Sequence, residues 1–233
     1  MALIKYLANL GYGSRREVTA LVAARRVTRQ GGVPVRDGDH PAHEELLVDG
    51  MPLDPARGVL LMLHKPVGYV CSTNDVPPLV YDLLPARFLK RTPVMAPVGR
   101  LDRDTSGLLL LTDDGALNHR LTSPRTHITK TYRATLADSL HGDEALRFAS
   151  GALLLAGEAT PLAPATLVVE EARTVRLTVS EGRYHQVRRM FAAVGNHVVT
   201  LQRIAIGALT PGDLTEGCWR EVTPAERVLL DAP

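Results

Sequence analysis

Apolar residues at the start of the chain recur at helical spacing. They fill one face of residues 3–10, and glycines at positions 11 and 13 end this predicted helix. Ser14 and Glu17 then have the spacing of a capping box, in which the hydroxyl and the carboxylate bind amide groups at a helix start. A second helix is therefore predicted, and it continues to about Ala24.

Short apolar runs follow the two predicted helices. Residues 33–35 and 46–48 are such runs, and Asp49 and Gly50 are typical of a tight turn that leads into residues 51–53. The first part of the chain is thus expected to contain two helices followed by a small sheet.

A break between two domains is predicted at residues 54–58. This segment contains a proline and a glycine and shows no apolar period. We therefore divide the chain into residues 1–57 and residues 58–233.

The second domain is rich in short runs of branched apolar residues, which are typical of strands. These runs cover residues 59–63, 108–111, 131–136, 165–169, 175–179 and 198–206. Helices are fewer, and they are predicted at residues 143–148, at residues 185–194 and after Thr223. The pattern predicts an α+β fold.

Composition and charge change this picture in one respect. The chain has 233 residues, 45% of them hydrophobic, so it can bury a core; a net charge of +2 and 4% aromatic residues do not suggest a nucleic-acid partner. The charge is unevenly distributed, however, because residues 1–36 contain seven Lys and Arg residues and one acid. This basic start carries +6 and the remainder −4, an asymmetry that points to a polyanionic partner.

Other features argue against metals, membranes and export. Cys71 and Cys218 are too few and too far apart for a disulfide scaffold or a zinc site, and the histidines show no metal-binding spacing. No segment reaches the roughly 20 apolar residues of a membrane helix, and the N-terminus lacks an export signal. We expect a soluble protein of the reducing cytoplasm that holds no metal.

A charged loop bounded by glycines, residues 99–107, leads directly into a predicted strand. Such a strand can hold charged side chains rigidly at a surface, as catalytic groups are commonly held, and Asp102 is the first candidate. The alternative is a turn whose aspartates cap backbone amides, and the residues alone leave both open. Asp113 and Asp114 are better interpreted as a helix cap than as a catalytic carboxylate pair.

A second dense group of charges covers residues 181–203. It contains four arginines and one glutamate, within a domain that is otherwise net acidic. A cluster of arginines suits phosphate recognition, whereas a charged helix flank commonly serves solubility alone. Lys130 and Tyr132 start a predicted strand, where the ring either fills a cross-strand position or stacks on a base.

Together these motifs resemble the pseudouridine synthases, and among them the Rsu family, which modifies ribosomal RNA. The resemblance covers nearly the whole chain and is carried by residues 64–73, 99–107, 130–132 and 180–196. It implies a catalytic domain built on a mixed, mainly antiparallel β-sheet with flanking helices. The first domain resembles a small RNA-binding module, the S-four-like module of a small-subunit ribosomal protein.

The resemblance also implies an isomerisation of uridine that uses no metal or cofactor. The bond between the uracil nitrogen and C1′ breaks, the base turns, and it is rejoined through carbon. By motif, Asp102 is the essential carboxylate, Tyr132 the ring beneath the target base, and Arg188 the basic partner that orients Asp102. An ionised carboxylate can act on the sugar as a nucleophile at C1′ or as a base at C2′, and both routes stay open.

The target uridine must leave its stack to be reached, so basic and polar side chains are expected to hold the surrounding RNA. The residues expected to bind RNA are Arg100, Arg103, Lys130, Arg183, His185 and Gln186 near the site, and Arg15, Arg16, Arg25 and Arg26 in the first domain.

The motifs at residues 112–115, 123–125 and 181–199 resemble the subgroup that acts on small-subunit (16S) rRNA, at a uridine of the uridine-516 type. One alternative is a synthase of the same family that acts on large-subunit (23S) rRNA. Another is a non-catalytic RNA-binding protein of ribosome assembly. The expected partner is ribosomal RNA or an assembly intermediate, and the protein is expected to be a monomer.

Overall fold

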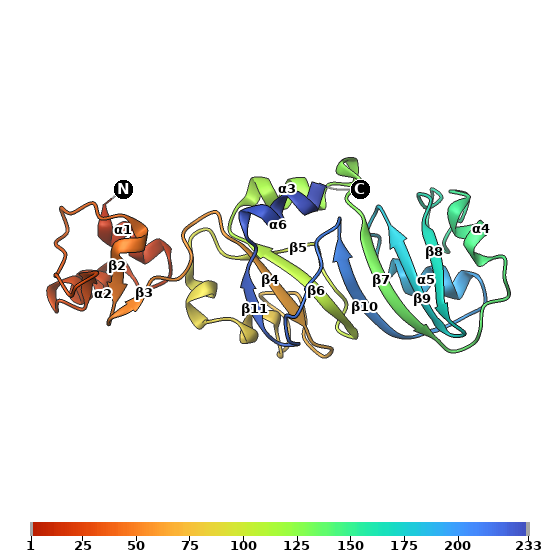
Figure 1. Cartoon of the computed structure of the whole chain (residues 1–233), viewed down its shortest axis with the longest axis horizontal. Coiled ribbons are helices and arrows are strands. Elements are labelled where there is room, and N and C mark those ends of the chain that lie inside the picture. The colour runs from red at the N-terminus through yellow and green to blue at the C-terminus, as the bar shows by residue number, and fades with distance from the viewer. Residues whose placement is uncertain (1, 232–233) are drawn as a thin grey trace.

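The computed structural model describes residues 2–231, which form two separate β-sheets (Figure 1). The N-terminal sheet is antiparallel, in the order β1-β2-β3, and two short helices pack beside it. These elements are α1 (Leu3–Asn9), α2 (Arg15–Ala23), β1 (Val27–Arg29), the 3-10 helix His43–Glu45, β2 (Leu46–Val48) and β3 (Met51–Pro52).

Local signals in the N-terminal part are confirmed, with one exception. Ser14 and Glu17 form the predicted capping box at the start of α2. The strand predicted at residues 33–35 is wrong, because only an isolated bridge joins Pro34 to Thr28. Proline has no N–H to give to a ladder, and the sheet instead uses β1, which the apolar pattern did not show.

The large sheet has eight strands in the order β11-β4-β6-β10-β7-β9-β8, with β5 paired to β6. All pairings are antiparallel except the parallel pair of β6 and β10, so the predicted mixed, mainly antiparallel sheet is confirmed. The strands are β4 (Leu60–Lys65), β5 (Ala96–Val98), β6 (Thr105–Thr112), β7 (Lys130–Leu136), β8 (Thr166–Glu171), β9 (Thr174–Val179), β10 (Val198–Ile206) and β11 (Trp219–Glu221).

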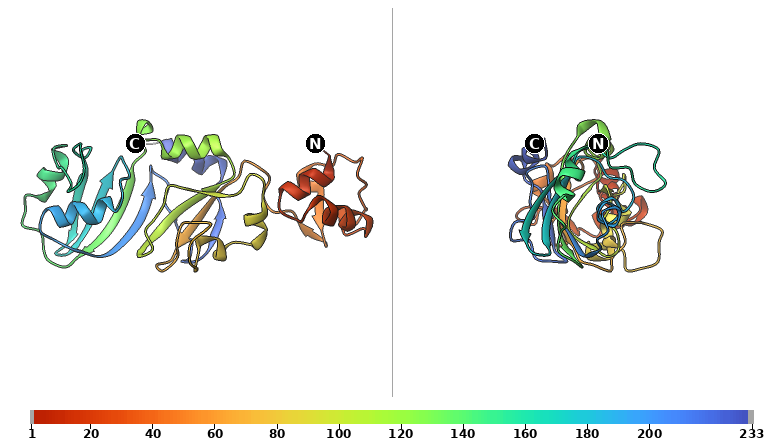
Figure 2. Two further views of the ribbon diagram at one scale, coloured as in Figure 1. Left: turned by 180° about the vertical axis from the view of Figure 1, so that it is seen from behind. Right: turned by 90° about the vertical axis from the view of Figure 1, so that its right-hand side faces the viewer.

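Helices flank this sheet, as Figures 1 and 2 show. Seen from behind, α5 lies across the end of the sheet that contains β7 and β9, whereas α3 and α6 lie together near β5 (Figure 2). The α-helices beside the large sheet are α3 (Gly115–Thr122), α4 (Glu144–Ala149), α5 (Gln186–Ala193) and α6 (Pro224–Val228). Short 3-10 helices occur at Val80–Leu83, Ala86–Lys90, Pro124–Thr126 and Leu229–Asp231. None of the helices within residues 2–231 is long and apolar enough to cross a membrane.

Close approach of β6 and β10 depends on a glycine. Gly107 has a φ of +105°, and a Cβ at this position would lie 2.2 Å from the carbonyl oxygen of Arg203. A larger residue would therefore push β10 away from β6. The pair brings the start of β6, next to the Asp102 loop, alongside the middle of β10.

The N-terminal sheet has its own buried cluster, which includes Leu7, Val18 and Leu46. The break predicted at residues 54–58 lies between β3 and β4. The division into two domains stays a prediction. Between β3 and β4, Asp54 forms a bidentate ion pair with Arg87, with contacts of 2.6 and 2.8 Å.

Candidate active site

A buried lysine holds the backbone of the loop that carries Asp102. Lys65, at the end of β4, is fully buried, and its Nζ donates to the carbonyls of Pro66 at 2.9 Å, Asp102 at 3.1 Å and Thr105 at 2.7 Å. Burial lowers the pKa of this lysine. Because the loop's carbonyls turn inward to the ammonium group, the backbone on both sides of Asp102 is held in place.

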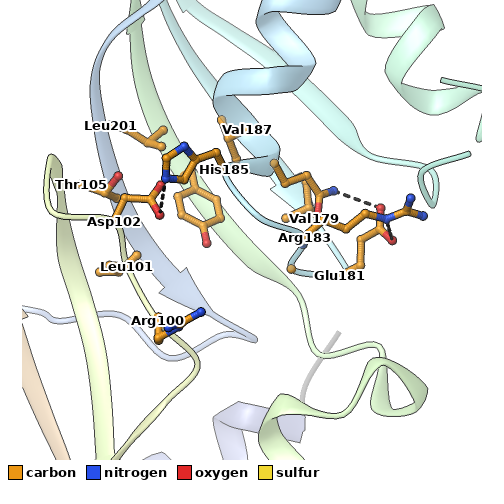
Figure 3. A pocket seen from close by; sticks show the side chains of 13 residues that line it. Arg100, Leu101, Asp102, Thr105, Val179, Glu181, Arg183, His185, Val187 and Leu201 are labelled. Atoms are coloured by element: carbon orange, nitrogen blue, oxygen red, sulfur yellow. Dashed lines mark hydrogen bonds and ion pairs between the residues drawn. The ribbon is translucent and has the colours of Figure 1, made fainter. Parts of the chain in front are cut away.

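The side chain of Asp102 faces a small cavity of about 80 Å³ between the loop, β7 and the segment before α5 (Figure 3). Tyr132, Thr105, Leu201 and His185 line the same cavity. The site thus joins a partly exposed carboxylate to an aromatic ring in a pocket lined by both polar and apolar side chains. This arrangement suits chemistry on a flat ring that carries a sugar.

His185 is the side chain that reaches Asp102. Its Nε2 lies 3.3 Å from Oδ1 of Asp102, and the two side chains point toward each other (Figure 3). Residue 185 adopts a left-handed backbone, with φ +48°, at the start of α5. The exposed ring of Tyr184 stacks on the imidazole, with centroids 3.9 Å apart and planes inclined by 16°.

Arg188, expected to orient Asp102, instead pairs with Asp104. Its Nη2 lies 2.8 Å from Oδ2 of Asp104, and its guanidinium also donates to the carbonyls of Asp104 and Val198. From α5, Arg188 therefore reaches the far end of the loop and ties it to β10. The imidazole of His185 takes the place beside Asp102 in which the arginine was expected.

Arg183 and Gln186 line the cavity, but their polar groups are engaged within the protein. Arg183 binds Glu181 at 3.2 Å and Glu158 at 3.3 Å, and it donates to two backbone carbonyls. Gln186 is buried, accepts from the amide of Arg183 and donates to Glu181. Both residues hold the segment before α5 in place. Direct contacts with RNA were expected of them, but their polar groups bind other parts of the protein instead.

The other residues expected near the site differ in exposure. Arg100 is exposed and lines the cavity, and Lys130 is half-buried at the start of β7. Arg103 is exposed, and its Nε donates to the carbonyl of Gly68 at 3.1 Å. The structure thus brings Asp102, Tyr132, His185 and Arg100 to one cavity, which Arg103 does not line.

The four arginines of residues 1–57 that are expected to bind RNA lie on or just after α2, outside the cavity. Arg15, Arg16 and Arg25 are exposed and have no ion pair with any residue from 2 to 231. Arg26 is also exposed but forms a bidentate ion pair with Asp49, with both contacts at 2.7 Å. Three of the four charges therefore face solvent unpaired.

Asp113 and Asp114 serve the fold, as expected. Asp114 caps α3 by accepting from the amides of Ala116 and Leu117. Asp113 is buried and pairs with the equally buried Arg91 at 2.8 Å. Within residues 2–231 no group of three His, Cys, Asp or Glu side chains could hold a metal ion.

Sequence reasoning missed the role of Lys65 and the unpaired polar atoms around the Asp102 loop. In the described part of the chain, three buried side-chain atoms lack a hydrogen-bond partner: Oγ1 of Thr105, Nε of Arg188 and Nη2 of Arg203. Buried polar groups are nearly always paired. Thr105 lines the cavity of Asp102, and Arg188 pairs with Asp104 of its loop, so two of the three unpaired atoms lie at the candidate site. A lysine at the end of an apolar strand was the one available signal for Lys65.

Comparison with known proteins defines the class of enzyme. The model of the RNA pseudouridylate synthase family matches residues 59–193, which include Asp102, Tyr132 and Arg188. The chain belongs to this family and is an isomerase that acts on RNA. A crystal structure of a pseudouridylate synthase matches 99% of this chain and 99% of its own length, with 38% identity and a TM-score of 0.69.

Full-length relatives place the chain in the Rsu branch of that family. The ribosomal small subunit pseudouridine synthase A of Yersinia pestis is 45% identical over 239 residues, covering 100% of this chain and 99% of the relative. The enzyme of the same name from Escherichia coli K12 is 45% identical, covering 97% and 98%. An uncharacterized RNA pseudouridine synthase of Bacillus subtilis, YtzG, is 40% identical, covering 100% and 99%.

Proposed function

We propose that this chain converts a uridine of small-subunit rRNA to pseudouridine, at the uridine-516 type of site, through Asp102. The observation that carries the proposal is the cavity that joins the Asp102 carboxylate to the ring of Tyr132. The relatives named as small-subunit enzymes support the choice of RNA, since they match along nearly their whole length.

In this proposal the flipped uracil stacks on Tyr132, which holds its glycosidic bond beside Asp102. The carboxylate acts on the sugar, as a nucleophile at C1′ or as a base at C2′. His185 orients the carboxylate through Oδ1, so that the other oxygen faces the sugar. Lys65 holds the loop from the opposite side and keeps this geometry while the base turns.

Unpaired arginines on and just after α2 give the protein a second contact with RNA. Exposed Arg15, Arg16 and Arg25 offer positive charge well away from the cavity, which suits a long RNA rather than a single nucleoside. With ribosomal RNA as its partner, the protein is expected to work in the cytoplasm, as a monomer.

Mapping pseudouridines in both rRNAs of cells that lack this chain tests the proposal. We expect one small-subunit pseudouridine to disappear and to return when the gene is restored. Loss of a large-subunit pseudouridine instead would assign the enzyme to the other subunit. An unchanged map together with rRNA binding would indicate a non-catalytic assembly protein.

A further inference from the structure

A second cavity, of about 150 Å³, adjoins the cavity of Asp102. The two share Arg100, Tyr132, Glu181 and Gly182, so Tyr132 lines both. The second cavity extends away from Asp102 toward Lys130 and Arg203, which do not line the first. Any nucleotide whose base lies on Tyr132 therefore has its neighbouring backbone within reach of this second space.

Strand register explains why two cations meet there. Lys130 and Tyr132 are two residues apart on β7, and Arg203 lies directly opposite Tyr132 on β10. Residues two apart on a strand, and residues opposite each other on neighbouring strands, share one face of the sheet. The three side chains consequently stand side by side on the face that forms the cavity.

The guanidinium of Arg203 is only partly satisfied. The residue is 3% exposed, and its Nε donates to the carbonyl of Leu108 at 2.7 Å, but its buried Nη2 has no partner. Because this Nη2 is closed to solvent, an anion in the cavity would meet Arg203 as a nearby positive charge and not as a hydrogen-bond donor, and it would offset that charge.

The ammonium group of Lys130 is equally unpaired within residues 2–231, where it has neither an ion pair nor a hydrogen bond. Burial and the nearby Arg203 lower its pKa. Glu181 lines the same cavity, but its carboxylate already accepts from Arg183, Gln186 and the amide of Ala163. Within residues 2–231, therefore, no side chain acts as the counter-ion of these two neighbouring cations.

We propose that Lys130 and Arg203 form a subsite for a backbone phosphate of the RNA, next to the uridine that stacks on Tyr132. This inference rests on the proposed function, because the RNA is what supplies the phosphate. A phosphodiester has the negative charge that would offset Arg203 and the acceptor oxygens that the ammonium group of Lys130 needs. Gly99 and Gly182 border the cavity without side chains, and open space surrounds the position of each missing Cβ, which leaves room for a nucleotide chain.

The test uses the full chain and a small-subunit rRNA fragment that spans the proposed uridine. In a series of such fragments, one phosphate at a time near the uridine is replaced by an uncharged methylphosphonate, and the Kd is measured for each. The proteins compared are the wild type, Lys130→Met, Lys130→Arg and Lys90→Met. Lys90 is an exposed lysine outside both cavities and serves as the matched control.

For the wild type, we expect one linkage beside the uridine at which neutralisation weakens binding about tenfold. Lys130→Met should bind the unmodified fragment about tenfold more weakly and lose much less than the wild type at that linkage, because only the charge of Arg203 remains there. Lys130→Arg should restore the wild-type pattern, and Lys90→Met should not change it. The test does not depend on Arg203 variants, whose burial makes them prone to misfolding.

Two results would overturn the subsite. In the first, neutralising any single linkage leaves the affinity of the wild type unchanged. In the second, neutralising each linkage weakens the binding of Lys130→Met as much as it weakens the binding of the wild type. Pseudouridine formation is measured on the same fragment. Wild-type protein that binds the fragment but forms no pseudouridine would contradict the proposed function, while the linkage pattern would still decide the subsite.

Discussion

Nε2 of His185 lies 3.3 Å from Oδ1 of Asp102, and this contact sets the direction of the carboxylate. The left-handed backbone at residue 185 turns the imidazole toward the loop, and the stacked ring of Tyr184 covers its other side. In the proposed reaction, His185 is therefore expected to act as a positioning residue for Asp102.

Replacement of His185 separates this role from general stability. His185→Leu should lower kcat about tenfold, because the contact of the imidazole with the carboxylate is lost, with a smaller change in KM. His185→Gln keeps a donor and should retain most of the rate. Tritium release from RNA labelled at C5 of uridine measures both variants. Equal rates for the wild type and His185→Leu would show that the contact does not serve the reaction.

Lys65→Met removes the donor shared by the carbonyls of the Asp102 loop. We expect the free energy of unfolding to fall by about 3 kcal/mol, since buried carbonyls lose a charged partner. The remaining folded protein should also lose activity, because the loop is no longer held. Chemical denaturation measures the first effect, with the exposed Lys90→Met as control. A variant as stable and as active as the wild type would rule out this role for Lys65.

Asp113→Asn should affect stability and leave catalysis alone. The substitution leaves the buried guanidinium of Arg91 without its counter-ion, which should cost about 3 kcal/mol of unfolding free energy or more. Turnover per folded molecule should match the wild type below the unfolding temperature. A large loss of turnover in fully folded protein would instead give this carboxylate a part in the reaction.

Three unpaired arginines on and just after α2 should determine part of the salt dependence of RNA binding. Replacing Arg15, Arg16 and Arg25 with serine should reduce the slope of log affinity against log salt by about 2, since fewer counterions are released. Arg26→Ser should change the slope less, because Asp49 already pairs with that side chain. Filter binding over a range of salt concentrations gives the slopes. Unchanged slopes would mean that this face does not touch the RNA.

Local sequence signals predicted local structure well. The capping box of Ser14 and Glu17 and the cap formed by Asp114 involve residues within a few positions of each other, and each is present. The strand predicted around Pro34 failed because an apolar run does not reveal whether a partner strand can accept a residue without an N–H.

Contacts between distant segments could not be predicted in the same way. The family motif brought Arg188 to the right region, but whether its guanidinium meets Asp102 or Asp104 depends on how α5 sits against the loop. Likewise, the pairing of Arg203 with Tyr132 across β10 and β7 is a matter of strand register, which the sequence of either strand alone does not contain.

The essential role of Asp102 in modifying small-subunit rRNA is the central claim, and one measurement addresses it directly. Cells that lack this chain are supplied with the wild type, with Asp102→Asn or with Asp114→Asn, and pseudouridine is quantified at the small-subunit site. Asparagine caps a helix about as well as aspartate, so Asp114→Asn should restore the modification fully. Asp102→Asn should accumulate as folded protein and restore none of it. Pseudouridine at the wild-type level in cells that depend on Asp102→Asn would contradict the account.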